Sequence, residues 1–252
     1  MGKRDRHWFE EVADHLGAAY LRYSFTKGTE QEVDFLVDVL GLRPGQRILD
    51  VGCGPGRHAH ALGRRGLEVV GVDISETFVD LARRDAPPGV SVLRADARAL
   101  EFDAEFDAVI SLCQGAFGLS DDGSRTVPLD PDAAVVDGMA RALRRGGLLA
   151  LSAFSAYFQI RYLGPEDSFD AERGVHHERV VVRDVAGREA EKDAWTTCFT
   201  PRELRLLMAA SGLRVRHLWS VTPGGYDRRP PDLEHPEFLV VAVKPEKRIL
   251  GA

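Results

Sequence analysis

The fold of this chain is decided by residues 47–73, which read RILDVGCGPGRHAHALGRRGLEVVGVD. The apolar run at 47–51 is bounded by a Pro-Gly pair before it and by glycines after it, which predicts a buried strand of a parallel sheet. Residues 57–65 predict a helix, and residues 68–73 predict a second strand that ends on a carboxylate. Between the first strand and the helix, three glycines allow a tight turn in which the backbone can approach a ligand closely. They are Gly52, Gly54 and Gly56.

The glycine loop alone does not identify the ligand, because dinucleotide-binding folds also have one. The dinucleotide pattern requires a further glycine where this chain has Arg57. Asp50 precedes the loop, and a carboxylate there repels a pyrophosphate but suits a cation or an ammonium group. Asp73 ends the second strand, in the right place to accept hydrogen bonds from ribose hydroxyls. A nucleoside with a positive, phosphate-free tail satisfies both acids, and S-adenosylmethionine is such a molecule.

The segments LDVGCGPG (49–56) and VVGVDIS (69–75) resemble motifs I and II of the class I S-adenosylmethionine-dependent methyltransferases, of the type that acts on small molecules. The resemblance covers roughly residues 46–151 and is diffuse outside them. It implies an α/β fold: a Rossmann-like seven-stranded, mostly parallel sheet with helices on both faces. It also implies S-adenosylmethionine as cofactor and S-adenosylhomocysteine as product. A nucleotide-binding fold with an unused loop is the alternative.

Two more strand ends complete the expected cofactor site. Residues 90–95 predict a third strand, and the Asp-Ala pair that follows it resembles motif III, in which the acid accepts the adenine amine. A turn or helix N-cap aspartate is the alternative. Residues 106–112 predict the fourth strand, whose exit loop stands at the motif IV position. The resemblance implies these cofactor-binding residues: Asp50, Gly52, Cys53, Gly54, Gly56, Asp73, Ile74, Asp96, Ala97, Leu112 and Gln114.

The exit loop of the fourth strand, CQGAFG at 113–118, narrows the choice of acceptor. Methyltransferases that act on exocyclic amines of bases or on glutamine side chains carry Asn/Asp-Pro-Pro-Tyr/Phe here, whereas this chain has SLCQ at 111–114. A loop of small residues with one amide and one phenyl ring suits a small, partly apolar acceptor. We expect Cys113 to be a small buried side chain rather than a nucleophile. No Asp/Asn cluster follows the strand, so we expect no metal.

Two segments outside the resemblance are expected to cover the site. Residues 7–24 carry aromatic side chains near helical spacing. In related methyltransferases such a helix is a lid over the cofactor with tyrosines facing the reaction centre; plain packing on the domain edge is the alternative. Residues 29–40 predict a second helix with a Thr29–Glu32 capping box. Residues 154–199 interrupt the family core with a β-hairpin that turns near 185–188, which predicts a substrate cover or a dimerisation surface.

The remaining chain completes one expected domain. Residues 133–145 predict a helix and 148–153 a fifth strand. Thr200 and Pro201 begin a last helix, and residues 213–220 and 237–243 predict the final strands, the last one antiparallel beside the sixth. The expected domain spans residues 1–252, divided into N-terminal helices with the lid (1–44), the cofactor-binding core (45–153), the insertion (154–199) and the C-terminal helix with the last two strands (200–252).

The catalytic residues are not assigned by the sequence, because methyl transfer needs a general base only for a protonated amine or a hydroxyl acceptor. The candidates for a base are Tyr20, Tyr23, Gln114, Tyr157 and His176. Adjacent strand residues face opposite sides, so His176 and His177 cannot easily chelate one ion, and a surface position is expected for them. The side chains expected to line the substrate pocket are Tyr20, Tyr23, Phe117, Tyr157, Trp195 and Tyr226.

Composition limits the partners. The net charge of −6 offers no electrostatic footprint for nucleic acid. No apolar run approaches the ~18 residues that span a bilayer, the chain opens without an apolar signal region, and its three cysteines suggest no disulfide framework. We therefore expect a cytoplasmic monomer or homodimer that transfers a methyl group to a small molecule, without a nucleic-acid or membrane partner. The alternatives are a relative that uses the cofactor for another reaction and a non-catalytic cofactor-binding protein.

Overall fold

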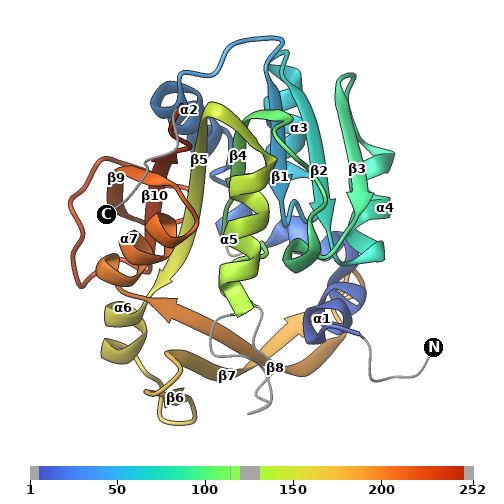
Figure 1. Cartoon of the computed structure of the whole chain (residues 1–252). Coiled ribbons are helices and arrows are strands. Elements are labelled where there is room, and N and C mark those ends of the chain that lie inside the picture. Colours follow the sequence, from blue (N-terminus) through green and yellow to red (C-terminus); the bar gives the residue numbers. More distant parts are fainter. Residues whose placement is uncertain (1–5, 114, 120–130, 247–252) are drawn as a thin grey trace.

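The computed structural model describes residues 6–113, 115–119 and 131–246, and within them an open twisted sheet forms the centre of the molecule (Figure 1). Its seven core strands have the order β3-β2-β1-β4-β5-β10-β9. The first five strands pair in parallel, whereas β10 is antiparallel to both of its neighbours. The predicted seven-stranded, mostly parallel sheet is confirmed, including the antiparallel last strand. The strands are β1 Arg47–Val51, β2 Glu68–Asp73, β3 Val90–Arg94, β4 Phe106–Ser111, β5 Leu143–Ser155, β9 Arg214–Val221 and β10 Glu237–Val243.

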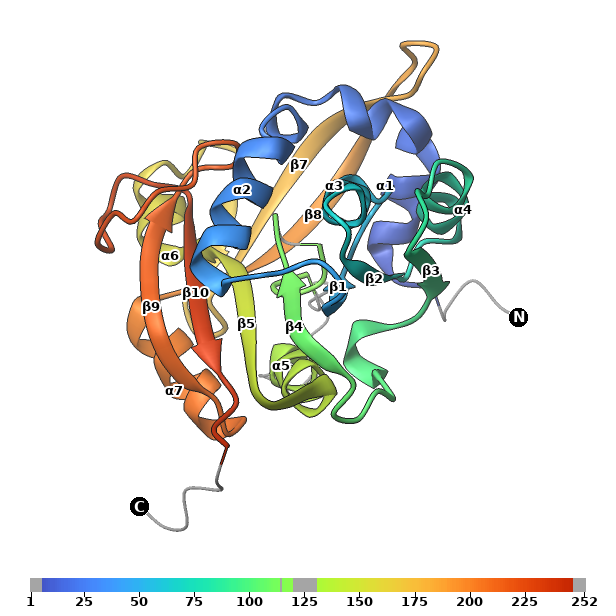
Figure 2. The ribbon, with the colours of Figure 1, turned by 90° about the horizontal axis from the view of Figure 1, so that it is seen from above.

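Helices cover both faces of this sheet (Figure 2). On one face, Ile48 and its neighbours pack against α2 (Thr29–Leu40) and α3 (Arg57–Arg64). On the other, Leu49 and its neighbours pack against α5 (Pro131–Ala142) and α7 (Pro201–Ala210). Successive strand residues face opposite sides of the sheet, so the continuous apolar runs of β1 and β4 are buried on both faces. Each large side chain buried in this way contributes roughly 1.5–3 kcal/mol. A further helix, α4 (Glu76–Arg84), packs on β3.

The insertion forms the predicted hairpin and extends the sheet. Its long strands β7 (Val175–Arg183) and β8 (Glu189–Phe199) pair antiparallel, and β6 (Ser168–Asp170) pairs with β7. The end of β8 joins the end of β5 in parallel, with Cys198 beside Phe154. The hairpin therefore crosses below the carboxyl ends of the core strands and reaches α1 (Figure 1). The short α6 (Ala156–Arg161) connects β5 to this insertion.

The N-terminal segment is a helix followed by tighter turns rather than one helix over 7–24. The α-helix α1 covers Trp8–Leu16 and ends at Gly17, whose φ of 47° is in the left-handed region. Two 3₁₀ segments follow, Gly17–Arg22 and Ser24–Thr26. Val12 and Leu16 pack against Val182 of the hairpin, so α1 and the insertion support each other.

Two local predictions were wrong. The capping box at the start of α2 does not form: Gly28 is the N-cap, Thr29 donates to the Thr26 carbonyl (2.7 Å), and Glu32 turns into the protein. The helix expected over 133–145 ends at Ala142, because the chain enters β5 there and its next residue pairs with β4. In both places tertiary partners outweigh a local signal.

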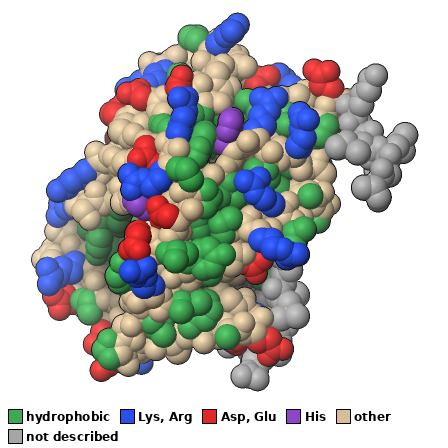
Figure 3. Space-filling view, turned by 90° about the vertical axis from the view of Figure 1, so that its left-hand side faces the viewer, with side chains coloured by type: hydrophobic (Ala, Val, Ile, Leu, Met, Phe, Trp, Pro, Cys, Tyr) green, Lys and Arg blue, Asp and Glu red, His purple; other side chains and the backbone are tan. Residues whose placement is uncertain are grey.

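The surface gives two further observations. None of the described helices combines the length and the apolarity needed to cross a bilayer. The side of the molecule that carries α6 and α7 exposes hydrophobic areas between basic and acidic side chains (Figure 3). On α6 and just after it, Ile160 and Tyr162 are each 55% exposed.

Candidate functional site

The glycine loop after β1 is held against β2 by its own backbone. The N–H groups of Gly52 and Cys53 both donate to the Val72 carbonyl, at 2.8 and 3.0 Å. Gly52, with φ of 74°, also lies against the loop after β4 so closely that a Cβ atom on it would be 2.1 Å from the Gly115 carbonyl carbon. Only glycine fits this position, because it needs both a positive φ and the absence of a side chain.

Asp73 ties the glycine loop to the next turn. Its carboxylate accepts hydrogen bonds from the N–H of Gly54 (2.8 Å) and from the N–H of Ser75 (2.8 Å). Ser75 caps α4 by accepting from the N–H of Phe78. The second-strand carboxylate is therefore fixed at the edge of the sheet, 3% exposed.

Two adjoining cavities lie at this edge. The smaller, about 40 Å³, is lined by residues that include Ile74, Asp96 and Ala97. The larger, about 350 Å³, extends from the glycine loop toward the hairpin and the start of β10. Five lining residues belong to both cavities: Phe9, Gly52, Asp73, Gly115 and Leu119. The arrangement matches the rule that open α/β sheets bind ligands outside the carboxyl ends of their strands.

Two buried acids flank the glycine loop: Asp73 lines both cavities, and Asp50 lies at the end of β1. Burial raises the pKa of Asp50 to about 7, with Asp73 adding to the shift and Arg57 opposing it. Burial also raises the pKa of Asp73 to about 6, against the two backbone hydrogen bonds that it accepts. Asp50 is 1% exposed and its Oδ2 has no hydrogen-bond partner. Acids whose ionisation is opposed in this way favour a positively charged ligand.

Asp96 combines the two alternatives open for it. It lines the smaller cavity, but it also caps the 3₁₀ segment Ala97–Ala99 by accepting from the N–H of Arg98 (2.9 Å). The Arg98 guanidinium bonds the same carboxylate at 2.6 Å. Burial opposes ionisation of Asp96, but these hydrogen bonds outweigh it and lower its pKa. The acid is thus ionised and held at the rim.

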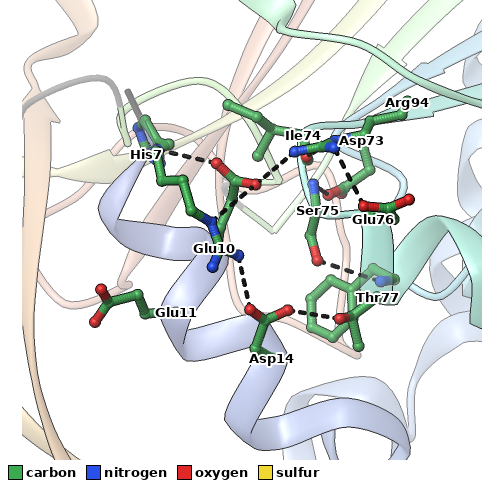
Figure 4. Close-up of polar contacts among 12 residues, drawn as sticks. His7, Glu10, Glu11, Asp14, Asp73, Ile74, Ser75, Glu76, Thr77 and Arg94 are labelled. Carbon is green, nitrogen blue, oxygen red and sulfur yellow. Dashed lines mark hydrogen bonds and ion pairs between the residues drawn. The ribbon is translucent and has the colours of Figure 1, made fainter. Parts of the chain in front are cut away.

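Helix α1 lies over the turn after β2 (Figure 4). Arg94 donates to the buried Glu10 of α1 at 2.8 Å and to the Ile74 carbonyl at 3.0 Å. One turn later, Asp14 accepts from Thr77 of α4 at 2.5 Å. His7 and Phe9 face the smaller cavity, and Trp8 and Phe9 face the larger one. The N-terminal helix therefore forms part of the cavity wall, and polar contacts fix its position.

The larger cavity has an aromatic wall and carboxylates from distant segments. Its rings come from the N-terminal segment, α4 and the end of β5; they are Trp8, Phe9, Tyr20, Phe25, Phe78 and Phe154. The Tyr20 ring lies 4.9 Å from that of Phe78. Burial, with the nearby Cys113, raises the pKa of the Tyr20 hydroxyl, which stays protonated at neutral pH. Glu178 of β7 and Glu237 of β10 also line the cavity.

A buried polar cluster lies beside the larger cavity. Glu32, fully buried, accepts hydrogen bonds from Arg57, from His58 Nε2 (2.8 Å) and from the N–H of Gly224 (2.7 Å). Arg57 Nη2 lies 2.7 Å from the Sγ of Cys113, a residue that lines the cavity. The cluster thus joins α2, α3, the loop after β4 and the loop after β9.

The charges of this cluster balance internally. Burial opposes ionisation of Glu32, but the hydrogen bonds and charges of His58 and Arg57 outweigh it and lower its pKa to about 2. Burial and the neighbouring Arg57 lower the pKa of His58, so the imidazole is neutral at pH 7 and Arg57 is the cation that pairs with Glu32. Burial raises the pKa of Cys113 well above its ordinary value, with the charge of Glu237 adding to the shift.

Three side chains of this cluster have the chemistry of metal ligands. Ligand atoms of Glu32, His58 and Cys113 lie within 4.8 Å of one another. The Arg57 guanidinium, however, contacts both Glu32 and Cys113, and it takes the place that a cation would need. We therefore read the group as an Arg-centred structural cluster.

The structure brings some of the predicted site residues together. Gly52, Gly54 and Asp73 line the larger cavity, and Ile74, Asp96 and Ala97 line the smaller one. Four further cofactor candidates line neither cavity: Asp50 is buried at the end of β1, Cys53 packs on α4, Gly56 adjoins His60, and Leu112 joins the core. Gln114 lies outside the described residues.

Several candidates for the substrate pocket are placed elsewhere. Phe117 is fully buried and stacks on Phe199 at 4.6 Å in the core, because the loop after β4 turns inward. Tyr157 is 40% exposed on α6. Tyr23 lies on the hairpin side of the N-terminal segment, where its hydroxyl accepts from the N–H of Arg183 (3.2 Å). None of these three side chains lines either cavity.

Three other candidates lie near the cavity without lining it. Trp195 packs on Trp8 (5.8 Å), on the face of β8 opposite the cavity-lining Thr196. The Tyr226 hydroxyl lies 4.0 Å from the Cys113 Sγ. His176 is 5% exposed, so the expected surface position was wrong for this histidine.

Sequence reasoning missed the acids that contact the site from outside the core. From the sequence, Glu32 is expected to cap α2, and Glu178 and Glu237 are not predicted as site residues. A signal for Glu237 exists: an antiparallel last strand begins at the edge where the parallel strands end, so its first residue lies at the edge where such sheets bind ligands. No comparable pattern marks Glu178.

The sheet order, the glycine loop and the acids at the strand ends together define a class I S-adenosylmethionine-dependent methyltransferase fold. A family model described as "Methyltransferase domain" matches residues 48–147 of this chain. The CcbJ methyltransferase from Streptomyces caelestis has the same fold, with a TM-score of 0.72 at 18% sequence identity over 95% of this chain and 97% of that one.

Two curated relatives extend the comparison. The chain is 36% identical over 121 residues to a demethylmenaquinone methyltransferase of Renibacterium salmoninarum, which covers 48% of this chain and 46% of that protein. It is 29% identical over 217 residues to a cypemycin N-terminal methyltransferase of a Streptomyces species, covering 78% of this chain and 82% of that protein. The chain thus spans about half the length of the demethylmenaquinone methyltransferases that it matches.

Proposed function

We propose that this protein transfers a methyl group from S-adenosylmethionine to a small-molecule acceptor. The observation that carries the proposal is the pair of adjoining cavities: a narrow one beside Asp73 and Asp96, and a wider aromatic one over the glycine loop. The narrow cavity borders the acids that would contact a nucleoside, and the wider one has room for the reacting end of the cofactor together with an acceptor. The family match and the two named relatives support methyl transfer, although the relatives' names give different acceptors.

The residues present fit this cofactor. Asp50 and Asp73 are buried acids that a positive ligand would stabilise in their ionised form, and Asp50 keeps an oxygen without a partner. We infer that Asp73 accepts the ribose hydroxyls and that the backbone of Gly52 and Gly54 borders the methionine end. Asp96 is proposed to lie beside the adenine. When bound, S-adenosylmethionine supplies a methyl group activated by a positively charged sulfur.

The role of the chain is then to align the acceptor and to exclude water. Alignment alone can supply effective molarities of roughly 10⁵–10⁸ M. We propose that residues 45–153 hold the cofactor, while residues 1–44, 154–199 and 200–252 build the acceptor side. The aromatic rings of the N-terminal segment close that side together with Glu178, Ala194 and Thr196 of the hairpin.

The direct test is calorimetric titration with S-adenosylmethionine and S-adenosylhomocysteine. The folded wild type should bind both, Asp73→Ala should lose roughly 10–100-fold in affinity, and Asp80→Ala, an exposed acid on α4, should bind as the wild type does. Absence of binding by the folded wild type would overturn the proposal. Release of S-adenosylhomocysteine with an acceptor then establishes turnover.

We further propose that the protein acts in the cytoplasm, as a monomer or homodimer, without a nucleic-acid partner. The net charge of −6 supports the absence of a nucleic-acid partner. Cys53, Cys113 and Cys198 are free thiols, which suits a reducing compartment. Sedimentation analysis of the purified chain tests the oligomeric state.

A further inference from the structure

The acceptor side of the larger cavity is acidic. Glu178 of β7 and Glu237 of β10 line it, and no Lys, Arg or His is among its described lining residues. Neither the hairpin nor β10 contributes a described residue to the smaller cavity, whereas Asp73 lines both. The two glutamates therefore belong to the part of the site that lies away from the proposed nucleoside position.

Glu237 is built into the sheet rather than carried on a surface loop. It is the first residue of β10, where it pairs with Phe154 of β5 and with Val221 of β9, and only 2% of it is exposed. Phe154 and the preceding Pro236 line the same cavity. The charge of Glu237 reaches Cys113 and Tyr226, because it helps to raise the pKa of both. The two neighbouring strands therefore fix the backbone of Glu237, and its side chain is buried at the wall of the cavity.

The rest of the wall is aromatic and suits the body of an organic cation. Trp8, Tyr20 and Phe25 come from the N-terminal segment and Phe78 from α4. The ring faces of such residues attract a cation, and their area also covers an apolar skeleton. A carboxylate or phosphate acceptor would meet like charge from Glu178 and Glu237, whereas an organic cation is attracted both by these carboxylates and by the ring faces.

Resting on the proposed methyl transfer, we propose that the acceptor is an amine with an apolar body, that Glu237 binds its nitrogen, and that Glu178 adds attraction from the hairpin. The amine arrives as an ammonium ion, and the Glu237 carboxylate takes one of its protons, which frees the lone pair. The nitrogen then forms a bond to the methyl carbon as the carbon–sulfur bond breaks and its electrons stay on sulfur. The methylated nitrogen carries the positive charge, and Glu237 returns its proton to solvent.

The test measures binding with S-adenosylhomocysteine present, so that the cofactor position is filled. Three probes of one shape are titrated calorimetrically: 2-phenylethylamine, 2-phenylethanol and phenylacetate. The wild type should bind the amine at least roughly tenfold more tightly than the alcohol, and phenylacetate most weakly. Glu237→Gln should remove the preference for the amine, and Glu237→Asp should keep part of it. Glu234→Gln, an exposed glutamate paired with Arg161, is the matched control and should keep it in full.

Each other outcome decides against the inference. Equal or tighter binding of the alcohol or phenylacetate, no detectable amine binding, or an unchanged preference in Glu237→Gln overturns it. If Glu237→Gln fails to bind S-adenosylhomocysteine, Glu178→Gln replaces it and must reduce the preference. Failure of the wild type to bind S-adenosylhomocysteine contradicts the proposed function itself, whereas binding of it without amine preference contradicts only the choice of acceptor.

Discussion

The two ends of the cavity system are built in different ways. Most of the proposed cofactor end comes from one stretch, which contains the loop after β1, the end of β2 and the end of β3; His7, Phe9 and the loop after β4 complete it. The acceptor end comes from the N-terminal segment, the hairpin and the start of β10, which are up to about two hundred residues apart. The first end depends on backbone conformation, and the second on side chains that long-range packing brings together. Single substitutions should therefore affect the two ends differently, through backbone strain at the first and through lost side-chain contacts at the second.

The largest effect is expected from Gly52→Ala at the cofactor end. The added methyl group would collide with the backbone of Gly115, and alanine disfavours the φ of 74°. We expect a loss of stability of about 3–5 kcal/mol and loss of measurable cofactor binding. Urea unfolding and calorimetry measure the two quantities.

The matched control is Gly45→Ala, which has φ of 83° but no atom within 4 Å of the added Cβ. It should show only the strain of the positive φ, about 1–2 kcal/mol, and bind the cofactor normally. If the two alanine variants behaved alike, the close approach of the two loops would not be what requires glycine at position 52.

The next effect tests the buried cluster that links the two ends. Glu32→Ala leaves Arg57 without its buried partner, so we expect a loss of about 3–5 kcal/mol. Glu30→Ala on the same helix removes an exposed ion pair with Arg65 and should cost no more than about 1 kcal/mol. Denaturant unfolding of both variants gives the comparison, and equal losses would contradict the assignment of the cluster.

The same cluster predicts an acid limit. The pKa of Glu32 is lowered to about 2 in the folded protein, below its ordinary 4.5. Its stabilisation is therefore complete above pH 4.5 and is lost as the pH falls toward 2, by roughly 3 kcal/mol in all. The difference in stability between wild type and Glu32→Ala should shrink over this window.

Asp50 and Asp73, which flank the glycine loop, make the stability depend on pH in the opposite direction. Their folded pKa values, about 7 for Asp50 and about 6 for Asp73, lie above the ordinary value. The stability that they contribute is present at acid pH and is lost as the pH rises through 6 to 7. A positive cofactor reverses this cost, so the thermal stabilisation by S-adenosylmethionine should be larger at pH 8 than at pH 5. Asp50→Asn should stabilise the free protein at pH 8, bind the cofactor more weakly and flatten this dependence.

The difference between the two ends also explains what the sequence could predict. Gly52 and Asp73 were predicted because the strand–loop–helix–strand pattern places them on contiguous residues whose local conformation is set by glycine and strand propensity. The same contiguity predicted the seven core strands. Single acids such as Glu178 and Glu237 belong to no local pattern, because their position depends on how the hairpin and the last strand dock.

Local rules were wrong where buried tertiary partners compete with them. Thr29 and Glu32 have the spacing of a capping box, worth about 1 kcal/mol, but Glu32 instead pairs with Arg57 and His58 inside the protein. Phe117 has the composition of a pocket residue but stacks on Phe199, to which it is brought by the return of the insertion. Neither partner could be identified before the fold was known.

The smallest effects are expected from replacing Tyr20 and Tyr23, the two tyrosines that the sequence offers as candidate bases. Burial raises the pKa of Tyr20, which lines the larger cavity, so its hydroxyl stays protonated at neutral pH and we expect Tyr20→Phe to change turnover by no more than a few-fold. Tyr23→Phe should leave turnover unchanged but lose about 1 kcal/mol of stability, because its hydroxyl no longer accepts from the N–H of Arg183. Steady-state kinetics and urea unfolding distinguish the two roles. A loss of turnover of a hundredfold or more in Tyr20→Phe would instead assign proton acceptance to the Tyr20 hydroxyl. Glu237 would then only bind the acceptor and would not act as its base.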